Sequence, residues 1–540
     1  MLDLNQIRYP IRYTTLFIAL AGLCFSVLVV LASGQSWIML LVFAALSAVG
    51  VHDLLQTHHA ILRNYPILGH MRFLLEFIRP EIRQYFIENE SEAAPFSRAQ
   101  RSLVYARAKG QSDKRPFGTQ LDVDQTGFEW LTHSMVPTTI ASHQFRTTVG
   151  NSACSQPYDI SLFNISAMSF GALSANAIMA LNQGAKMGGF AHDTGEGSIS
   201  RYHRIHGGDL IWEIGSGYFG CRDDQGRFSP ERFVAQAREP QVRMIEIKLS
   251  QGAKPGHGGV LPASKVTPEI AEARGVPLGA DCVSPAAHSS FSTPTELLVF
   301  LQSLRELSQN KPVVFKLCIG HPWEWFGIAK AMLETRILPD FIVVDGAEGG
   351  TGAAPLEFSD HMGMPLKEGL RLVHNTLVGI GLREHVKLGA SGKIISSFDL
   401  ARVLALGADW CNSARGFMFA LGCIQAQTCH TGNCPTGVTT QDPQRQMALV
   451  VPSKAERVKN FHQHTLESFK ELLQAAGLTS PEQLQAHHFF HRISHTETQT
   501  LAQMYPALTN GALLKDSVTK LPDPFKTYWG KASAQSFHWQ

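Results

Sequence analysis

The chain has 540 residues, which is too long for one compact domain and predicts about two to four folding units. Charged residues make up 17 % of it and the net charge is +2, so nothing indicates a polyanion-binding surface and we expect no nucleic-acid partner. Its nine cysteines are too few for a disulfide scaffold and fit reduced thiols in a cytosolic compartment.

The first element in chain order is a predicted transmembrane hairpin over residues 1–53. Residues 13–51 carry no charge, and "YTTLFIALAGLCFSVLVVLA" supplies twenty residues, enough to cross ~30 Å of hydrocarbon as a helix. The turn signal "SGQS" separates it from a second apolar run that begins at Trp37. A cleaved signal peptide and a buried core segment are the alternatives. An inner-membrane hairpin with both ends and the catalytic domain in the cytoplasm is predicted by the flanking arginines, Arg8, Arg12, Arg63 and Arg72.

Residues 54–130 are predicted to form a linker with amphipathic character. The stretch "RFLLEFIRPEIRQYFIE" mixes apolar and charged residues at helical spacing, and we expect Pro80 to break its helix. Such a segment lies either on the membrane face or around the next domain, and the sequence leaves both alternatives open.

Residues 131–450 predict an α/β domain, a (β/α)8 TIM barrel. Short apolar runs recur from about residue 160, and each ends in a Gly/Ser-rich or polar loop. A doubly wound sheet is the alternative, but polar clusters follow nearly every run, as the catalytic face of a barrel requires. We expect a long insertion over 195–243 and a helical C-terminal extension over 451–540. The eight expected strands are ISAMS at Ile165, GGFAHDT at Gly188, MIEIKLS at Met244, GADCVS at Gly279, VVFKLC at Val313, FIVVDG at Phe341, VKLGASG at Val386 and ADWCNSA at Ala408.

A formal dinucleotide fingerprint occurs in "IGSGYFG", at Gly215, Gly217 and Gly220. The residues after it, "CRDDQGRFSPE", predict a turn and not the helix whose N-terminus must hold the pyrophosphate. We therefore reject a nicotinamide site here.

Several loops that follow the expected strands are suited to a flavin. Small residues around Met168 and Ser169 would let a flat ring lie against the backbone, and the glycines beside Gly350 and Thr351 allow close approach of a ligand. The last two strands lead into "GASGK" and "SARG", at the positions that form the phosphate site of a barrel. For any one of these loops a simple glycine turn is the alternative. The residues expected at the phosphate are Ser391, Gly392, Ala414 and Arg415.

Lys316 ends the fifth expected strand, inside "FKLC". A lysine in an apolar strand requires an anionic partner, and reduced flavin, which is negative near N1, would be a suitable one. A lysine that reaches solvent at the rim of the barrel is the alternative.

Two cations and an amide surround the glycine-rich loop after "MIEIKLS". They are Gln251, Lys254 and Arg274, a set suited to a dicarboxylate because an ammonium and a guanidinium can each bind one carboxylate. Glu196, in "TGEGS", supplies a carboxylate from a neighbouring strand-end loop. The alternative is a solvated rim of charges.

Three cysteines, Cys423, Cys429 and Cys434, lie within twelve residues of "LGCIQAQTCHTGNCPTG". Zinc sites usually contain closer Cys pairs and a fourth ligand, so the wider, unequal gaps favour an iron–sulfur cluster. Three unrelated thiols are the alternative.

The motifs "TGEG", "QGAKPGHGG.LP..K", "GGTGA.P" and "GC..AQTCHTGNCPTGVTTQ" resemble the FMN-binding synthase domain of glutamate synthase over residues 160–440. The chain is most similar to membrane-anchored, single-domain proteins of that type. The resemblance implies a barrel that binds FMN, a [3Fe–4S] cluster and 2-oxoglutarate. It places the cluster on Cys423, Cys429 and Cys434, 2-oxoglutarate on Gln251, Lys254 and Arg274, and the catalytic set on Glu196, Lys254 and Gln251.

The activity implied is reductive amination of 2-oxoglutarate to L-glutamate, with electrons that reach FMN through the cluster. We expect two departures from the family: the chain has no glutaminase domain and no pyridine-nucleotide module. Ammonia and electrons are therefore expected to come from other molecules. The electron donor is an unidentified ferredoxin-like protein or reductase subunit. Two alternatives remain: an N-alkylglutamate synthase-like enzyme that uses an alkylamine, and a membrane electron-transfer flavoprotein without amino-acid turnover.

Overall fold

The computed structural model describes residues 11–89, 94–352, 354–515 and 520–539, so Arg8 lies outside the described residues. The chain divides into two units, Met1–Arg98 and Ala99–Gln540, and each is described by itself.

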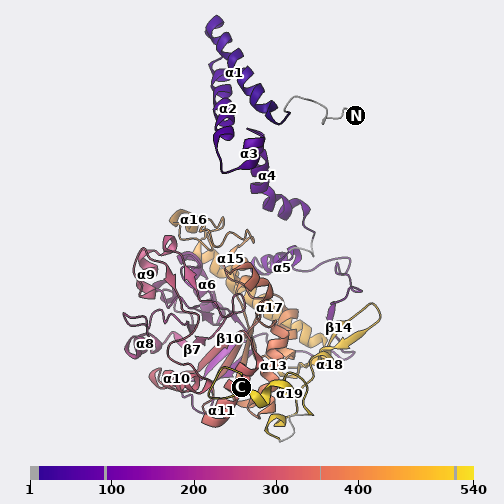
Figure 1. Cartoon of the computed structure of the whole chain (residues 1–540). Coiled ribbons are helices and arrows are strands. Elements are labelled where there is room, and N and C mark those ends of the chain that lie inside the picture. The colour runs from indigo at the N-terminus through magenta and orange to yellow at the C-terminus, as the bar shows by residue number, and fades with distance from the viewer. Residues whose placement is uncertain (1–10, 90–93, 353, 516–519, 540) are drawn as a thin grey trace. The chain divides into compact units, whose positions relative to one another are not determined.

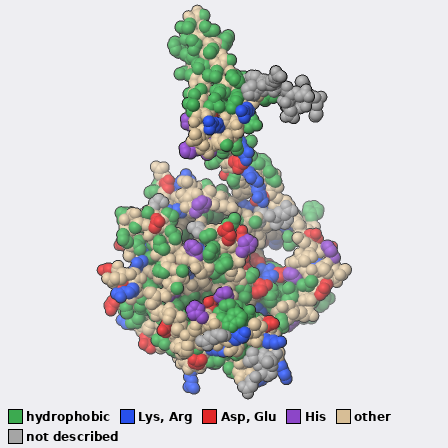
Figure 2. Space-filling view, viewed as in Figure 1, with side chains coloured by type: hydrophobic (Ala, Val, Ile, Leu, Met, Phe, Trp, Pro, Cys, Tyr) green, Lys and Arg blue, Asp and Glu red, His purple; other side chains and the backbone are tan. Residues whose placement is uncertain are grey.

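The first unit contains two long apolar helices, α1 (Thr14–Ser33) and α2 (Trp37–Leu55), after the short turn η2 (Ile11–Tyr13). Both are long and apolar enough to cross a membrane, with mean hydropathies of 2.7 and 2.1. They pack closely, since a Cβ on Gly22 would lie 2.3 Å from the Phe43 ring. Hydrophobic side chains cover most of the visible surface of this pair (Figure 2).

Shorter helices complete the first unit: α3 (Ala60–Asn64), α4 (Gly69–Ile82) and the π-helical turn η3 (Arg83–Ile87). The expectation that Pro80 breaks the helix is wrong. Pro80 lies inside α4, and the helix continues directly into the π-helical turn, a widening of the hydrogen-bond ladder that can accommodate a missing donor.

The second unit is built around a closed barrel of eight parallel strands, which confirms the predicted fold class (Figure 1). The last strand pairs with the first through Cys411 and Phe163, and nearly every strand residue is buried. Such strands are mostly apolar because both of their faces are covered. In chain order the strands are β4 (Phe163–Ile165), β5 (His192–Asp193), β6 (Leu210–Ile214), β7 (Val242–Lys248), β10 (Val313–Leu317), β11 (Phe341–Asp345), β12 (Lys387–Ser391) and β13 (Trp410–Ser413).

One expected strand is wrong and one was missed. The GADCVS segment contains β9 (Cys282–Val283), which pairs antiparallel with β8 (Val260–Leu261) outside the barrel. The missing strand is β6, which lies inside the region expected to be an insertion and pairs with β5 and β7. The long excursion is instead 249–293, between β7 and α10. The turn expected after "IGSGYFG" is confirmed, since β6 is followed by turns and α8 begins only at Pro230.

Helices cover the outside of the barrel and begin at side-chain caps such as Ser174, Ser229, Thr293 and Ser396. The helices between barrel strands are α6 (Ala175–Gly188), α7 (Arg201–Arg204), α8 (Pro230–Ala237), α9 (Pro268–Arg274), α10 (Pro294–Leu307), α11 (Pro322–Thr335), α12 (Leu356–His361), α13 (Leu366–Gly379) and α14 (Ser397–Ala405).

The C-terminal extension contains the expected helices, of which α17 (Val451–Ala475) packs against α6, α14 and α15 (Arg415–Leu421). It also contains strands that the sequence did not predict: β14 (Phe489–Arg492) pairs with β15 (Thr498–Thr500) and with β1 (Glu129–Leu131). The remaining elements are α5 (Arg98–Ala108), β2 (Arg146–Val149), β3 (Tyr158–Ser161), α16 (Pro443–Met447), α18 (Leu501–Met504) and α19 (Phe525–Tyr528).

Candidate active site

The candidate site residues gather at one end of the barrel, because most of them lie at or just after the carboxyl ends of parallel strands. Arg274 is the last residue of α9 and Arg415 is the first residue of α15. Lys316 lies within β10. Met168 and Ser169 follow β4, Glu196 follows β5, Gln251 and Lys254 follow β7, Gly350 and Thr351 follow β11, Gly392 follows β12, and Ala414 and Arg415 follow β13, while Ser391 is the last residue of β12.

Glu196, Gln251 and Lys254 line one cavity, together with Lys248. The ammonium of Lys248 lies 2.8 Å from Glu196 Oε2 and donates to Gln251 Oε1 at 3.2 Å. Lys254 donates to the carbonyl of Gly258 at 3.2 Å. The cavity therefore presents two ammonium groups, a carboxylate and an amide to whatever occupies it.

Glu196 is held in its ionised form. Burial opposes ionisation, but Lys248 beside it, with further contributions from Arg274 and Lys254, lowers the pKa of Glu196 to about 2. Burial lowers the pKa of Lys254, and Glu196 opposes this effect. At neutral pH, Glu196 can therefore accept a hydrogen bond or a proton but cannot donate one.

Arg274 lies beside this cavity and does not line it. Its guanidinium is buried, donates from Nη2 to the carbonyl of Phe170 at 3.1 Å, and lies 5.3 Å from the centre of the Phe219 ring. Its Nε has no hydrogen-bond partner among the described residues. Arg274 thus connects the loop after β4 to the charges around Glu196.

Lys316 has carboxylate partners inside the barrel. Its ammonium is paired with Glu213 on β6 and lies 3.0 Å from Glu246 Oε1 on β7, and all three side chains are buried. Carboxylate oxygens of Asp193, Glu213 and Glu246 lie within 4.8 Å of one another. Burial, followed by the nearby Asp193 and Asp345, raises the pKa of Glu246, and burial likewise raises that of Asp193. The partner that Lys316 requires is therefore present in the protein itself.

The expected cofactor loops pack against one another in pairs. A Cβ on Gly195 would lie 2.6 Å from the backbone nitrogen of Ser169, and one on Gly350 would lie 1.2 Å from Arg415 Nη2. A side chain at Gly195 would collide with backbone, whereas one at Gly350 would have to displace the end of the Arg415 side chain. Ser391 donates from Oγ to Asp345 Oδ1 at 2.5 Å, which fixes the end of β12 to the end of β11.

The three cysteines of the last motif converge. Cys423, Cys429 and Cys434 line a common small cavity, and Gly352 packs against Cys429. The backbone amide of Gln425 donates to the sulfur of Cys423 at 3.5 Å. Burial opposes ionisation of Cys434, but hydrogen bonds from Thr436 and Thr439 outweigh it and lower the pKa of this thiol to about 7. Burial raises the pKa of Cys423 to about 11.

Sequence reasoning missed four charged residues in the strands: Lys248, Asp193, Glu213 and Glu246. A signal was present, since each is a charge within or at the end of an apolar run ("HDT", "LIWEI", "MIEIK"). A charge in such a run must find a buried partner, and this requirement holds for these four residues as it does for Lys316.

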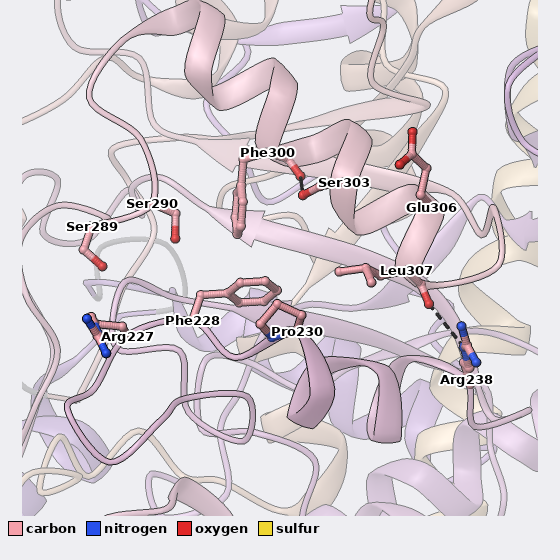
Figure 3. Close-up of a pocket in the computed structure, with 10 residues that line it drawn as sticks. All are labelled: Arg227, Phe228, Pro230, Arg238, Ser289, Ser290, Phe300, Ser303, Glu306 and Leu307. Atoms are coloured by element: carbon pink, nitrogen blue, oxygen red, sulfur yellow. Dashed lines mark hydrogen bonds between the residues drawn. The ribbon is translucent and has the colours of Figure 1, made fainter.

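A larger cavity of about 710 Å³ lies outside the barrel, between α8 and α10 (Figure 3). None of the predicted site residues lines it. Its two arginines already have partners, because Arg227 pairs with Asp223 and Arg238 donates to the carbonyl of Leu307. We therefore assign the chemistry to the strand-end loops.

Known proteins resemble this chain over the barrel domain. Residues 136–479 match the family model described as a conserved region in glutamate synthase. The chain is 38 % identical over 483 residues to the glutamate synthase large subunit-like protein YerD of Bacillus subtilis, a match that covers 82 % of this chain and 91 % of that protein. It is 37 % identical over 321 residues to the archaeal glutamate synthase (NADPH) of Methanocaldococcus jannaschii, covering 59 % of this chain and 60 % of that one. A crystal structure of mandelate oxidase aligns with a TM-score of 0.40 and 14 % identity, over 79 % of this chain and 96 % of that chain, which is too distant to carry an argument.

Proposed function

The chain belongs to the glutamate synthase family of oxidoreductases, and on this premise we propose that it reductively aminates 2-oxoglutarate to L-glutamate. The observation that carries the proposal is the cavity that joins Glu196, Gln251 and Lys254, with Arg274 beside it. Two cations at the edge of a buried cavity match a substrate with two carboxylates.

In this proposal Lys254 and Arg274 each bind one carboxylate of 2-oxoglutarate, and Gln251 orients the substrate through its amide. Glu196, which is ionised, accepts protons and hydrogen bonds from the attacking amine. Lys248 lies close enough to Glu196 to return a proton to the carbonyl oxygen that leaves as water.

FMN fits the loops at this end of the barrel. Gly350 and Gly392 have no side chain to block the approach of a ligand to the backbone, and Arg415 brings a cation. Met168, Ser169, Gly350, Thr351, Ser391, Gly392, Ala414 and Arg415 would hold the cofactor, and Lys316 would favour its anionic reduced form. When bound, FMN supplies the hydride for reduction of the imine.

A [3Fe–4S] cluster fits the cysteine loop, because three thiols converge on one cavity and hydrogen bonds reach two of the sulfurs. Cys423, Cys429 and Cys434 would be its ligands. The cluster would deliver single electrons from a donor protein to the flavin site.

Purified protein is expected to contain FMN and about three irons per chain, as three thiolate ligands imply. Cys429→Ser should lose the iron yet keep most of the FMN, as measured by metal analysis and flavin absorbance. Cys154→Ser is the control, because this thiol lies outside the loop and its loss should leave the iron content unchanged. Stoichiometric zinc without iron in the wild type would contradict the assignment.

We also propose that α1 and α2 form an inner-membrane hairpin with both ends and the catalytic unit in the cytoplasm. Within the most apolar stretch of each helix, only 22 % and 17 % of the residues are buried in the protein. This low burial favours a lipid environment over a place in a protein core. The arginines beyond the hairpin, Arg12 and Arg63, suit the cytoplasmic side.

The activity is tested by reoxidation of the flavin. Protein whose FMN has been reduced photochemically is mixed anaerobically with 2-oxoglutarate and ammonium, and the flavin spectrum and glutamate are followed. Rapid reoxidation with stoichiometric glutamate is expected. Fast flavin reoxidation with methylamine but not with ammonium would replace the proposal with an N-alkylglutamate synthase activity. If no keto acid reoxidises the flavin, electron transfer without amino-acid turnover would be the remaining function.

A further inference from the structure

The end of the transmembrane hairpin is fastened to the segment that follows it. Asp53, near the end of α2, is buried, accepts a hydrogen bond from the backbone amide of Ile67 at 2.9 Å, and has His70 Nε2 3.0 Å from both of its oxygens. Thr15, at the start of α1, donates to the carbonyl of Pro66 at 2.7 Å. These contacts hold the first residues of α4 at the base of the hairpin, where the chain leaves the hydrocarbon if the hairpin spans a membrane.

The helix that starts there exposes an unusual amount of apolar surface. Phe77 is 79 % exposed and Phe86 is 84 % exposed. A contiguous patch of this kind marks a contact with a partner or a membrane. The other large apolar residues exposed along α4 and η3 are Met71, Phe73, Leu74, Leu75, Ile82, Tyr85 and Ile87.

Most apolar and charged residues of α4 fall on different sides, with Glu81 as the charged residue on the apolar side. At helical spacing, Met71, Leu74 and Ile78 share one side. Arg72, Glu76 and Arg79 share another, and Arg72 pairs with Glu76 at 3.6 Å. An apolar side bordered by arginines is the pattern of a helix that lies in a membrane surface.

We propose that α4 and η3 lie in the plane of the membrane, with Leu74 and Ile78 at the acyl boundary and Arg72 and Arg79 against anionic headgroups. The inference rests on the proposed hairpin. A bilayer fits this surface better than a protein partner for two reasons. The contacts at Asp53 and Thr15 hold the start of α4 at the height of the headgroups, and the arginines beside the apolar side complement anionic lipid.

The test compares two positions in the full-length protein, reconstituted in vesicles of phosphatidylethanolamine and phosphatidylglycerol. Leu74→Cys and Glu76→Cys are treated with a membrane-impermeant maleimide, and the labelled sites are read by peptide mass spectrometry. The two positions are matched, since Leu74 is 59 % exposed and the side chain of Glu76 is 56 % exposed without a membrane. We expect the cysteine at 74 to react at least about tenfold more slowly, because its site is covered by lipid. Equal rates would overturn the proposal.

A second measurement identifies what covers residue 74. A phospholipid with a photoactivatable diazirine in its acyl chain should crosslink to residues 69–87 of the wild-type protein as well as to α1 and α2. Slow labelling at 74 without lipid crosslinks to 69–87 would place the apolar side on protein and overturn the inference. Absence of crosslinks from α1 and α2, together with maleimide labelling of Cys24, would instead contradict the hairpin.

Discussion

Lys316→Met is expected to lower the free energy of unfolding by about 3–5 kcal/mol at neutral pH, because it removes one partner of a buried ion-pair network. The ammonium of Lys316 is buried between Glu213 and Glu246, and Asp193 lies close by. Without the cation, these carboxyl groups stay ionised only at a high cost in free energy. Urea unfolding of the purified protein measures the loss as a shift of the midpoint.

The loss should depend on pH. Folding raises the pKa of Glu246 and of Asp193, chiefly through burial. An acid whose pKa is raised by folding contributes stability that is present below its unfolded pKa and is lost as the pH rises toward the folded pKa. The variant lacks the charge of Lys316, which lowers the pKa of Asp193 in the wild type, so it should raise that folded pKa further. Its stability should therefore fall from pH 5 to pH 8 more steeply than that of the wild type, by up to ~1.4 kcal/mol per pH unit for each proton.

Lys387→Met is the matched control. Lys387 also pairs with a carboxylate, Asp409 at 3.5 Å, but its side chain is 37 % exposed. Loss of such a pair should cost within about 1 kcal/mol. Equal losses in the two variants would contradict the buried network. If Lys316→Met unfolds like the wild type but changes only the flavin spectrum, the lysine serves the cofactor and not the fold.

The barrel could be predicted from the sequence because seven of its strands are apolar runs that end in polar or small residues. The strand β6 was missed because it carries Glu213 and runs directly into a glycine-rich turn that looked like part of an insertion. The opposite error at Gly279 arose because a short hairpin strand outside the barrel has the same local pattern. Local patterns do not show which strands pair, since pairing depends on contacts distant in the chain.

The candidate site could be predicted from the sequence only in part, for a similar reason. Gln251 and Lys254 are close neighbours in the chain, and so are the three cysteines. Their proximity in space could therefore be expected from their spacing in the sequence. The network around Lys316 joins β5, β6, β7 and β10. Which charges in these strands meet inside the barrel depends on strand register, which the spacing of residues does not reveal.

Arg274→Ala is expected to weaken binding of 2-oxoglutarate by about 30- to 1,000-fold, the equivalent of ~2–4 kcal/mol for a lost charge-assisted hydrogen-bond pair. The guanidinium is buried near Glu196, and its Nε has no hydrogen-bond partner among the described residues. A substrate carboxylate would supply that partner. Titration of the oxidised protein with 2-oxoglutarate, followed by the flavin spectrum or by calorimetry, measures the dissociation constant.

Two further variants separate the binding of substrate by Arg274 from its contacts with the surrounding protein. Arg222 also lies over the Phe219 ring, at 5.6 Å, so Arg222→Ala removes a similar aromatic contact and should leave substrate binding within about threefold of the wild type. Glu196→Gln should lower turnover while changing binding little, because it removes a proton acceptor and not a carboxylate ligand. Since the pKa of Glu196 is about 2, its ionisation should not shape the activity profile of the wild type between pH 5 and 9. If Arg274→Ala binds 2-oxoglutarate with wild-type affinity, the role of this arginine is to hold the carbonyl of Phe170. The second carboxylate of the substrate would then need another cation. Lys248, which pairs with Glu196, would be the candidate.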